Sequence, residues 1–107
     1  MELKAFNIIQ KEYKDDENFF LTCEAFIGPE GIEYVYEVYS IYVISLKRLN
    51  ASLIDEEIML NKGWMIQKKY DESKVKEKIK SIINICTEKD EQKTYSNLAA
   101  YFFMQDC

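Results

Sequence analysis

Residues 18–44 read NFFLTCEAFIGPEGIEYVYEVYSIYVI, and this stretch decides the fold. Its two ends, residues 18–27 and 32–44, are rich in the aromatic and β-branched side chains that favour β-strands. Between them, Pro29 presets the φ angle of a central turn position, and Gly31 can adopt the positive φ that many tight turns require. The stretch therefore predicts a β-hairpin.

The two strands of this hairpin should present different side chains on their two faces, because successive residues of a strand point in opposite directions. One face of the first strand is apolar and carries Phe19, Leu21, Cys23, Ala25 and Ile27. The other face of that strand carries Phe20, Thr22, Glu24 and Phe26. In the second strand, Glu33 and Glu37 alternate with Tyr34 and Tyr36. We expect Glu24, Glu33 and Glu37 to share a solvent-facing surface.

The rest of the chain predicts one strand before the hairpin and mostly helices after it. The expected elements are a strand at 3–9, a polar loop at 11–17, a short helix at 45–50, a strand at 64–70, helices at 71–88 and 90–100, and a short last strand at 101–105. Residues 51–62 are ambiguous. Ser45 and Asp71 are expected helix caps, with Leu46 and Leu49 facing the core. The clearest helix has an apolar stripe formed by Val75, Ile79, Ile82, Ile83 and Cys86.

Strands followed by helices indicate an α+β fold. We expect an antiparallel sheet of about four strands with two C-terminal helices packed on one face. A chain of 107 residues fits one domain over residues 1–107.

The sequence offers little material for catalysis or metal binding. The chain has no histidine, which removes the commonest catalytic base and the commonest partner of cysteine in zinc sites. Cys23 and Cys86 lie in apolar surroundings and are expected to be buried, whereas Cys107 is expected to be an exposed thiol. Glu33 and Glu37 resemble the charges of an ordinary solvated strand more than a catalytic pair. We therefore expect no catalytic residue, no cofactor and no metal site, and predict that the chain is not an enzyme.

The charge balance favours a basic protein partner. The formal net charge is −5, with 19 acidic and 14 basic residues, whereas nucleic-acid binding depends on lysine and arginine. An acidic chain attracts a basic partner through electrostatic complementarity. No apolar run is long enough to span a membrane, and the first residues do not form a secretory signal. We expect a cytoplasmic protein that binds neither nucleic acid nor membrane.

Acidic and aromatic side chains are the candidate partner-binding residues. Eight tyrosines and six phenylalanines are many for a chain of this size, and tyrosine is favoured at protein interfaces. The candidates are Asp15, Asp16, Glu17, Glu24, Phe26, Glu30, Glu33, Glu37 and Tyr39. The alternative interpretation is that the tyrosines belong to the core and that the acids occupy ordinary solvated loops.

Several short motifs resemble the bacterial immunity protein 8 family. They are Ile27-Gly28-Pro29 with Gly31, the acidic and aromatic strand that follows, the short helix at 45–49, and an apolar strand ending in Tyr70-Asp71 before a helix. The resemblance implies an immunity protein of a polymorphic or contact-dependent growth inhibition system, which binds a toxin domain in the cytoplasm and blocks it. A basic target such as a nuclease would match the charge.

Two other hypotheses remain open at this stage. In the first, the chain is a non-catalytic adaptor that completes a larger assembly through the edge of its hairpin. In the second, it is a small enzyme that uses carboxylates. We expect the free chain to be a monomer or a weak dimer.

Overall fold

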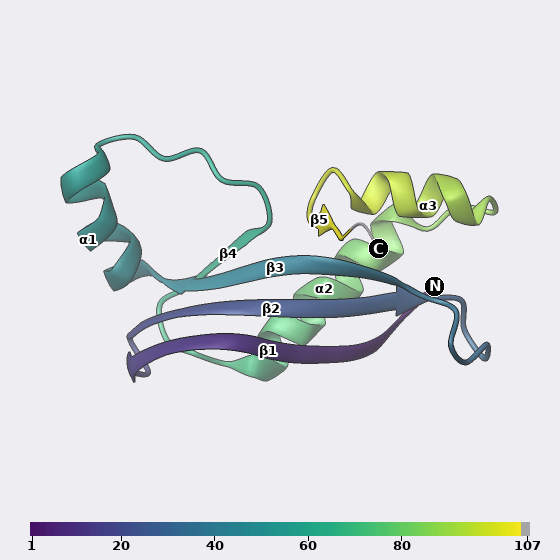
Figure 1. The fold of residues 1–107 in the computed structure, drawn as a ribbon, viewed down its shortest axis with the longest axis horizontal. Coiled ribbons are helices and arrows are strands. Elements are labelled where there is room, and N and C mark those ends of the chain that lie inside the picture. The colour runs from purple at the N-terminus through teal and green to yellow at the C-terminus, as the bar shows by residue number, and fades with distance from the viewer. Residues whose placement is uncertain (106–107) are drawn as a thin grey trace.

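A computed structural model describes residues 1–105 and shows a mixed sheet with helices mainly on one side (Figure 1). The elements are β1 (Glu2–Asp15), β2 (Asn18–Gly28), β3 (Glu37–Ser45), α1 (Leu46–Glu56), β4 (Trp64–Gln67), α2 (Glu72–Cys86), α3 (Glu91–Leu98) and β5 (Phe103–Met104). The α+β class and the two C-terminal helices are confirmed. The expectation for Cys107 lies outside the described residues.

Strand β2 forms the centre of the sheet and follows the predicted alternation. Its apolar side chains Phe19, Leu21, Cys23, Ala25 and Ile27 are all fully buried. Strand β1 pairs with it along its whole length, Glu2 opposite Gly28 and Asp15 opposite Asn18. The predicted loop at 11–17 was therefore wrong over residues 11–15. Those residues are polar because they lie at the exposed edge of the sheet, where a strand needs no apolar face.

The predicted turn at 28–31 is in fact a longer connection, and β3 begins only at Glu37. Tyr34 adopts a φ of 64°, which is incompatible with a continuous strand. Glu37 pairs with Ile27 and so lies on the same side of β3 as the buried Tyr39, whereas Glu24 points to the opposite face. The predicted surface shared by Glu24, Glu33 and Glu37 was therefore wrong.

The free edge of β3 is divided between two short strands. β4 pairs with Tyr42–Ser45 in parallel, and β5 pairs with Tyr39 and Ser40 in antiparallel fashion. The expected sheet of about four antiparallel strands thus has five strands, with one parallel pair. The parallel pair arises because residues 46–63 form a helix and a long return segment. They carry the chain back along the sheet, so that β4 then runs beside β3 in the same direction.

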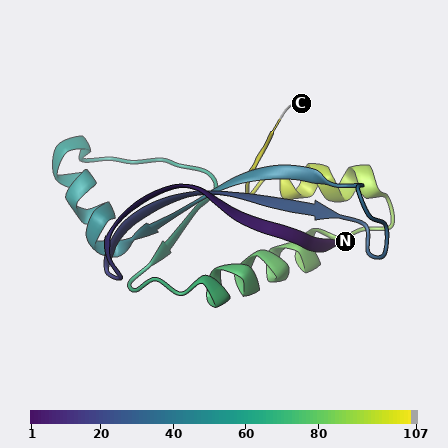
Figure 2. The ribbon, with the colours of Figure 1, turned by 60° about the horizontal axis from the view of Figure 1, so that its bottom comes forward.

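Helices α2 and α3 cover the apolar side of the sheet. Figure 2 shows α2 beneath the strands. The Asp71 side chain caps α2 by accepting a hydrogen bond from the Lys74 amide, as predicted. All five residues of the predicted stripe are buried. From α3, Tyr95 and Leu98 reach the same core.

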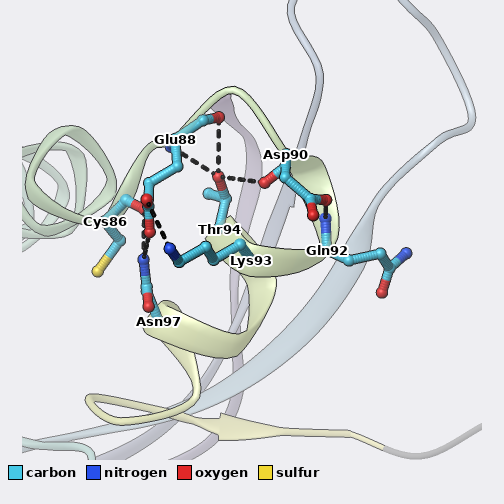
Figure 3. Close-up of polar contacts among 7 residues, drawn as sticks. All are labelled: Cys86, Glu88, Asp90, Gln92, Lys93, Thr94 and Asn97. Atoms are coloured by element: carbon cyan, nitrogen blue, oxygen red, sulfur yellow. Dashed lines mark hydrogen bonds and ion pairs between the residues drawn. The ribbon is translucent and has the colours of Figure 1, made fainter.

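Hydrogen bonds of buried Thr94 fix the connection between α2 and α3 (Figure 3). The Thr94 hydroxyl accepts from the Glu88 amide at 2.9 Å and donates toward the Glu88 and Asp90 carbonyl oxygens, each at 3.3 Å. Asn97 donates to the Cys86 carbonyl oxygen at 3.1 Å and to the Glu88 carboxylate at 2.7 Å. This bond, together with nearby Lys93, lowers the pKa of Glu88 below its ordinary value.

Helix α1 stands apart from α2 and α3 at one end of the molecule (Figure 1). Ser45 caps it, as predicted, by accepting a hydrogen bond from the Arg48 amide. Arg48 also pairs with Glu12 of β1 at 3.0 Å. None of the residues of α1 is buried, and Leu46 is 44% exposed. The prediction that Leu46 faces the core was wrong, because no second layer covers this helix.

Candidate protein-binding surface

The sheet face opposite α2 carries a row of aromatic side chains. Phe20, Tyr42 and Trp64 come from three neighbouring strands, with ring centroids 6.0 Å apart for Phe20–Tyr42 and 5.4 Å apart for Phe20–Trp64. Each ring is only partly buried. Aromatic side chains in such contacts form stable, rigid platforms, which is a property of protein interfaces.

A second aromatic pair joins this face to the loop at 29–36. The rings of Phe26 and Tyr36 stack with centroids 5.0 Å apart. The loop can fold back here because residue 28 is glycine: a Cβ at Gly28 would collide with the carbonyl oxygen of Val35 and would lie 2.8 Å from the Lys4 side chain. Lys4 in turn donates to the Ile32 carbonyl oxygen at 2.8 Å. Both contacts hold the loop against the strands.

The tip of this loop displays Tyr34 to the solvent. Its side chain is 90% exposed, and its backbone is in the left-handed region, which non-glycine residues adopt only at a cost in energy. Ile32 and Val35 beside it are 49% and 44% exposed. Large apolar side chains held outward on a strained backbone suggest a binding function, because folding alone gains nothing from this arrangement.

The same part of the chain is strongly acidic. Between Lys14 and Lys47 there is no lysine or arginine, whereas seven acids occur there, namely Asp15, Asp16, Glu17, Glu24, Glu30, Glu33 and Glu37. We use the name aromatic–acidic surface for the open sheet face and the loop beside it. Its residues are Phe20, Glu24, Phe26, Glu30, Glu33, Tyr34, Tyr36, Tyr42 and Trp64.

The predicted binding residues do not all reach this surface. Phe26 and Glu33 line a shallow depression with Tyr34 and Tyr36, and Glu24 lies on the same sheet face as Phe26. Glu30 belongs to the same loop but lines a neighbouring depression.

The acids Asp15, Asp16 and Glu17 lie at the opposite end of the molecule, where Asp15 ends β1 and the other two form the turn to β2. Tyr39 and Glu37 project toward the helices instead. Tyr39 is fully buried and donates a hydrogen bond to the Tyr95 carbonyl oxygen at 3.1 Å. Its side chain therefore belongs to the core, and we do not include it in the surface.

Sequence reasoning did not predict the cluster of Phe20, Tyr42 and Trp64. The alternation in β2 places Phe20 opposite the buried face, but the positions of Tyr42 and Trp64 depend on the register of the sheet. Tyr42 lies opposite Thr22 on one side and Trp64 on the other. The available signal was Phe20, an aromatic residue at a position of β2 that points away from the core. Such a residue needs a partner on the next strand.

Burial favours the neutral form of two ionisable groups, the buried Cys23 and the partly buried Tyr70. Burial, reinforced by the Glu72 carboxylate, raises the pKa of Cys23 to about 12. Burial likewise raises the pKa of Tyr70 to about 12, with Glu72 again as the next cause. A thiol with a raised pKa is a poor nucleophile. Within residues 1–105, no group of three or more cysteines and carboxylates could hold a metal ion.

The family model for immunity protein 8 matches residues 1–103. The chain belongs to the immunity protein 8 family. Searches of the curated proteins and of the solved structures found no match. In the part of the chain that the structure describes, no helix is long and apolar enough to cross a membrane.

Proposed function

We propose that this chain neutralises a cognate bacterial toxin by binding the toxin domain tightly through the aromatic–acidic surface. Membership in the immunity protein 8 family supports a toxin as the partner. The observation that carries the choice of surface is Tyr34, which is 90% exposed on a left-handed backbone in a surface that also contains the three carboxylates of Glu24, Glu30 and Glu33. Lys4, which lines the same depression as Tyr34, is already engaged with Glu2 and the Ile32 carbonyl oxygen.

The chemistry of the surface specifies its partner. Stacked rings supply apolar area at a low entropic cost, and they act as anchors when they become fully desolvated. The surrounding carboxylates favour a partner with exposed lysine or arginine and disfavour one with like charge. We propose a basic toxin domain, with a nuclease as the favoured class because nucleases carry basic side chains for their phosphate substrate. Binding takes place in the cytoplasm and involves no catalysis by this chain.

The test is a titration of the chain into the toxin domain encoded by the neighbouring gene. We expect nanomolar affinity, which corresponds to about −12 kcal/mol, and weaker binding at high salt as the steering charges are screened. The variant Glu33→Lys should weaken binding and reduce its salt dependence. Glu77→Lys on exposed α2 makes the same charge change elsewhere and should bind as the unchanged chain does.

A second pair of variants separates binding from folding. Tyr34→Asn removes the ring and places a residue that tolerates the left-handed region, so stability should be kept while affinity falls at least about tenfold. Tyr34→Phe keeps the ring and should keep most of the affinity. Equal affinity of Tyr34→Asn and the unchanged chain would show that the toxin binds another surface. Absence of binding to the neighbouring toxin would instead favour an adaptor role.

A further inference from the structure

The end of α1 and the residues after it expose large aliphatic side chains. Ile54 is 81% exposed, Ile58 is 84% exposed and Leu60 is 97% exposed. We call residues 54–60 the α1 tip. Isolated exposed apolar residues are ordinary, but three within seven residues form a patch that favours burial against another molecule. Figure 1 shows no neighbouring helix or strand against this end of α1.

The α1 tip also carries a concentrated negative charge. Asp55, Glu56 and Glu57 are consecutive, and the last turn of α1 contains no basic residue. A helix C-terminus already bears a partial negative charge, so acids there destabilise the isolated helix. None of the three acids forms an ion pair with any residue among 1–105. The tip therefore suits a receptor that is apolar inside and positively charged at its rim.

A groove with these properties lies on the same chain, between β4 and α2. It has a volume of about 420 Å³. Its apolar lining includes Met65, Val75, Ile82 and Phe102, and its charged lining consists of Lys74 and Lys78 with no acid. Neither lysine forms an ion pair in the described part of the chain. The β4 edge that borders the groove has no strand partner among residues 1–105.

We infer that the occupant of this groove is the α1 tip of a second copy of this chain. The aliphatic side chains of the tip enter the apolar lining, and Asp55, Glu56 and Glu57 meet Lys74 and Lys78. In a reciprocal dimer, each copy places its tip in the groove of the other, so the assembly closes at two chains. If each copy used only its tip toward one neighbour and its groove toward another, an open chain of subunits would form. This inference does not depend on the proposed toxin binding, because its charged contacts, the acids of the tip and the lysines of the groove, lie outside the aromatic–acidic surface. The groove lining shares only Trp64 with that surface.

The test uses two charge-reversed variants of the full chain, examined by sedimentation equilibrium. The groove variant is Lys74→Glu with Lys78→Glu, and the tip variant is Asp55→Lys, Glu56→Lys and Glu57→Lys. In each variant alone, the tip and the groove carry charges of the same sign and repel each other. Each variant should therefore remain a monomer of about 12.7 kDa. In an equimolar mixture both contacts become complementary again, and a heterodimer should form. The unchanged chain should form a dimer that dissociates as salt is raised.

Two further variants control for charge and for the apolar contribution. Lys80→Glu with Lys89→Glu changes the net charge by the same amount outside the groove, and should dimerise as the unchanged chain does. Ile54→Ser with Ile58→Ser leaves the charge unaltered and should weaken dimerisation at least tenfold, whereas Ile85→Ser, a change at an exposed residue of α2, should not. A monomeric unchanged chain at all concentrations would overturn the inference, as would a mixture of the two reversed variants that stays monomeric.

Discussion

The buried hydroxyl of Tyr39 in the sheet donates a hydrogen bond to the main-chain oxygen of Tyr95 in α3, at 3.1 Å. This bond crosses the core and ties α3 to the central strands. The Ala99 amide donates to the same oxygen, so that oxygen keeps one partner if the hydroxyl is removed.

Replacing Tyr39 by Phe should therefore cost only about 1 kcal/mol of unfolding free energy, the usual net value of one hydrogen bond. Urea denaturation of the two proteins measures the difference. A loss above about 3 kcal/mol would mean that the hydroxyl supports more than this single contact. Because Tyr39 is buried, Tyr39→Phe should not change toxin affinity.

Alkaline pH should destabilise the protein, beginning near pH 9. Cys23 has an ordinary pKa of 9.0 and a folded pKa of about 12. For Tyr70 the two values are 10.0 and about 12. A raised folded pKa means that the neutral form is favoured by folding, so this stability is present below the unfolded pKa and is lost as pH rises toward 12. Denaturation midpoints at several pH values measure the decline.

The Cys23 part of this decline can be isolated. Cys23→Ala removes the thiol, so the stability of this variant should change less between pH 9 and pH 10, where a thiol of the unfolded chain ionises more extensively than tyrosine does. Equal slopes for the two proteins in that interval would show that Cys23 does not contribute.

The connection between α2 and α3 should depend on buried Thr94 more than on its exposed ion pair. Thr94→Val leaves the Glu88 amide without its hydrogen-bond acceptor, which should cost about 1–3 kcal/mol. Lys93→Ala removes an ion pair with Glu88 in which the Lys93 side chain is 64% exposed, and should cost less than about 1 kcal/mol. Denaturant unfolding of both variants tests this order, and a reversed order would contradict it.

Gly28 at the end of β2 and Gly31 in the connection after it should respond differently to replacement by alanine. At Gly28 the added Cβ collides with the Val35 carbonyl oxygen, so Gly28→Ala should cost about 1–3 kcal/mol and displace the binding loop. A Cβ added at Gly31 would meet no atom within 4 Å, but φ is 73° at this residue. Gly31→Ala should therefore cost only the backbone penalty of about 1–2 kcal/mol. Toxin affinity should fall for Gly28→Ala and change little for Gly31→Ala.

The parts of the fold that sequence predicted are those with a strong buried face. The alternation of β2 and the stripe of α2 were correct because each has one fully apolar side. Residues 11–15 gave no such signal, since both of their faces are exposed at the sheet edge. Residues 32–36 gave a false one, because their strand-like composition is overridden by the packing of the loop against Gly28. β-propensity depends on tertiary context in this way.

The candidate site was predictable in composition but not in geometry. Phe26 and Glu33 were both among the candidates, and the structure places them beside one shallow depression, whereas their role in binding stays a prediction. Tyr39 has the same local sequence character as Tyr34. The register of β3 buries Tyr39, whereas Tyr34 is exposed because it lies in the loop before β3, with a positive φ. The parallel pairing of β3 and β4, which brings Trp64 beside Tyr42, depends on a contact between distant segments that no local pattern encodes.

The most direct test of the central claim is a titration of toxin activity. Increasing amounts of this chain are added to a fixed amount of the toxin domain encoded beside its gene, and the remaining activity is measured. We predict a linear loss that is complete at one chain per toxin, with Tyr34→Asn requiring a large excess. Full toxin activity in the presence of excess chain would contradict the account.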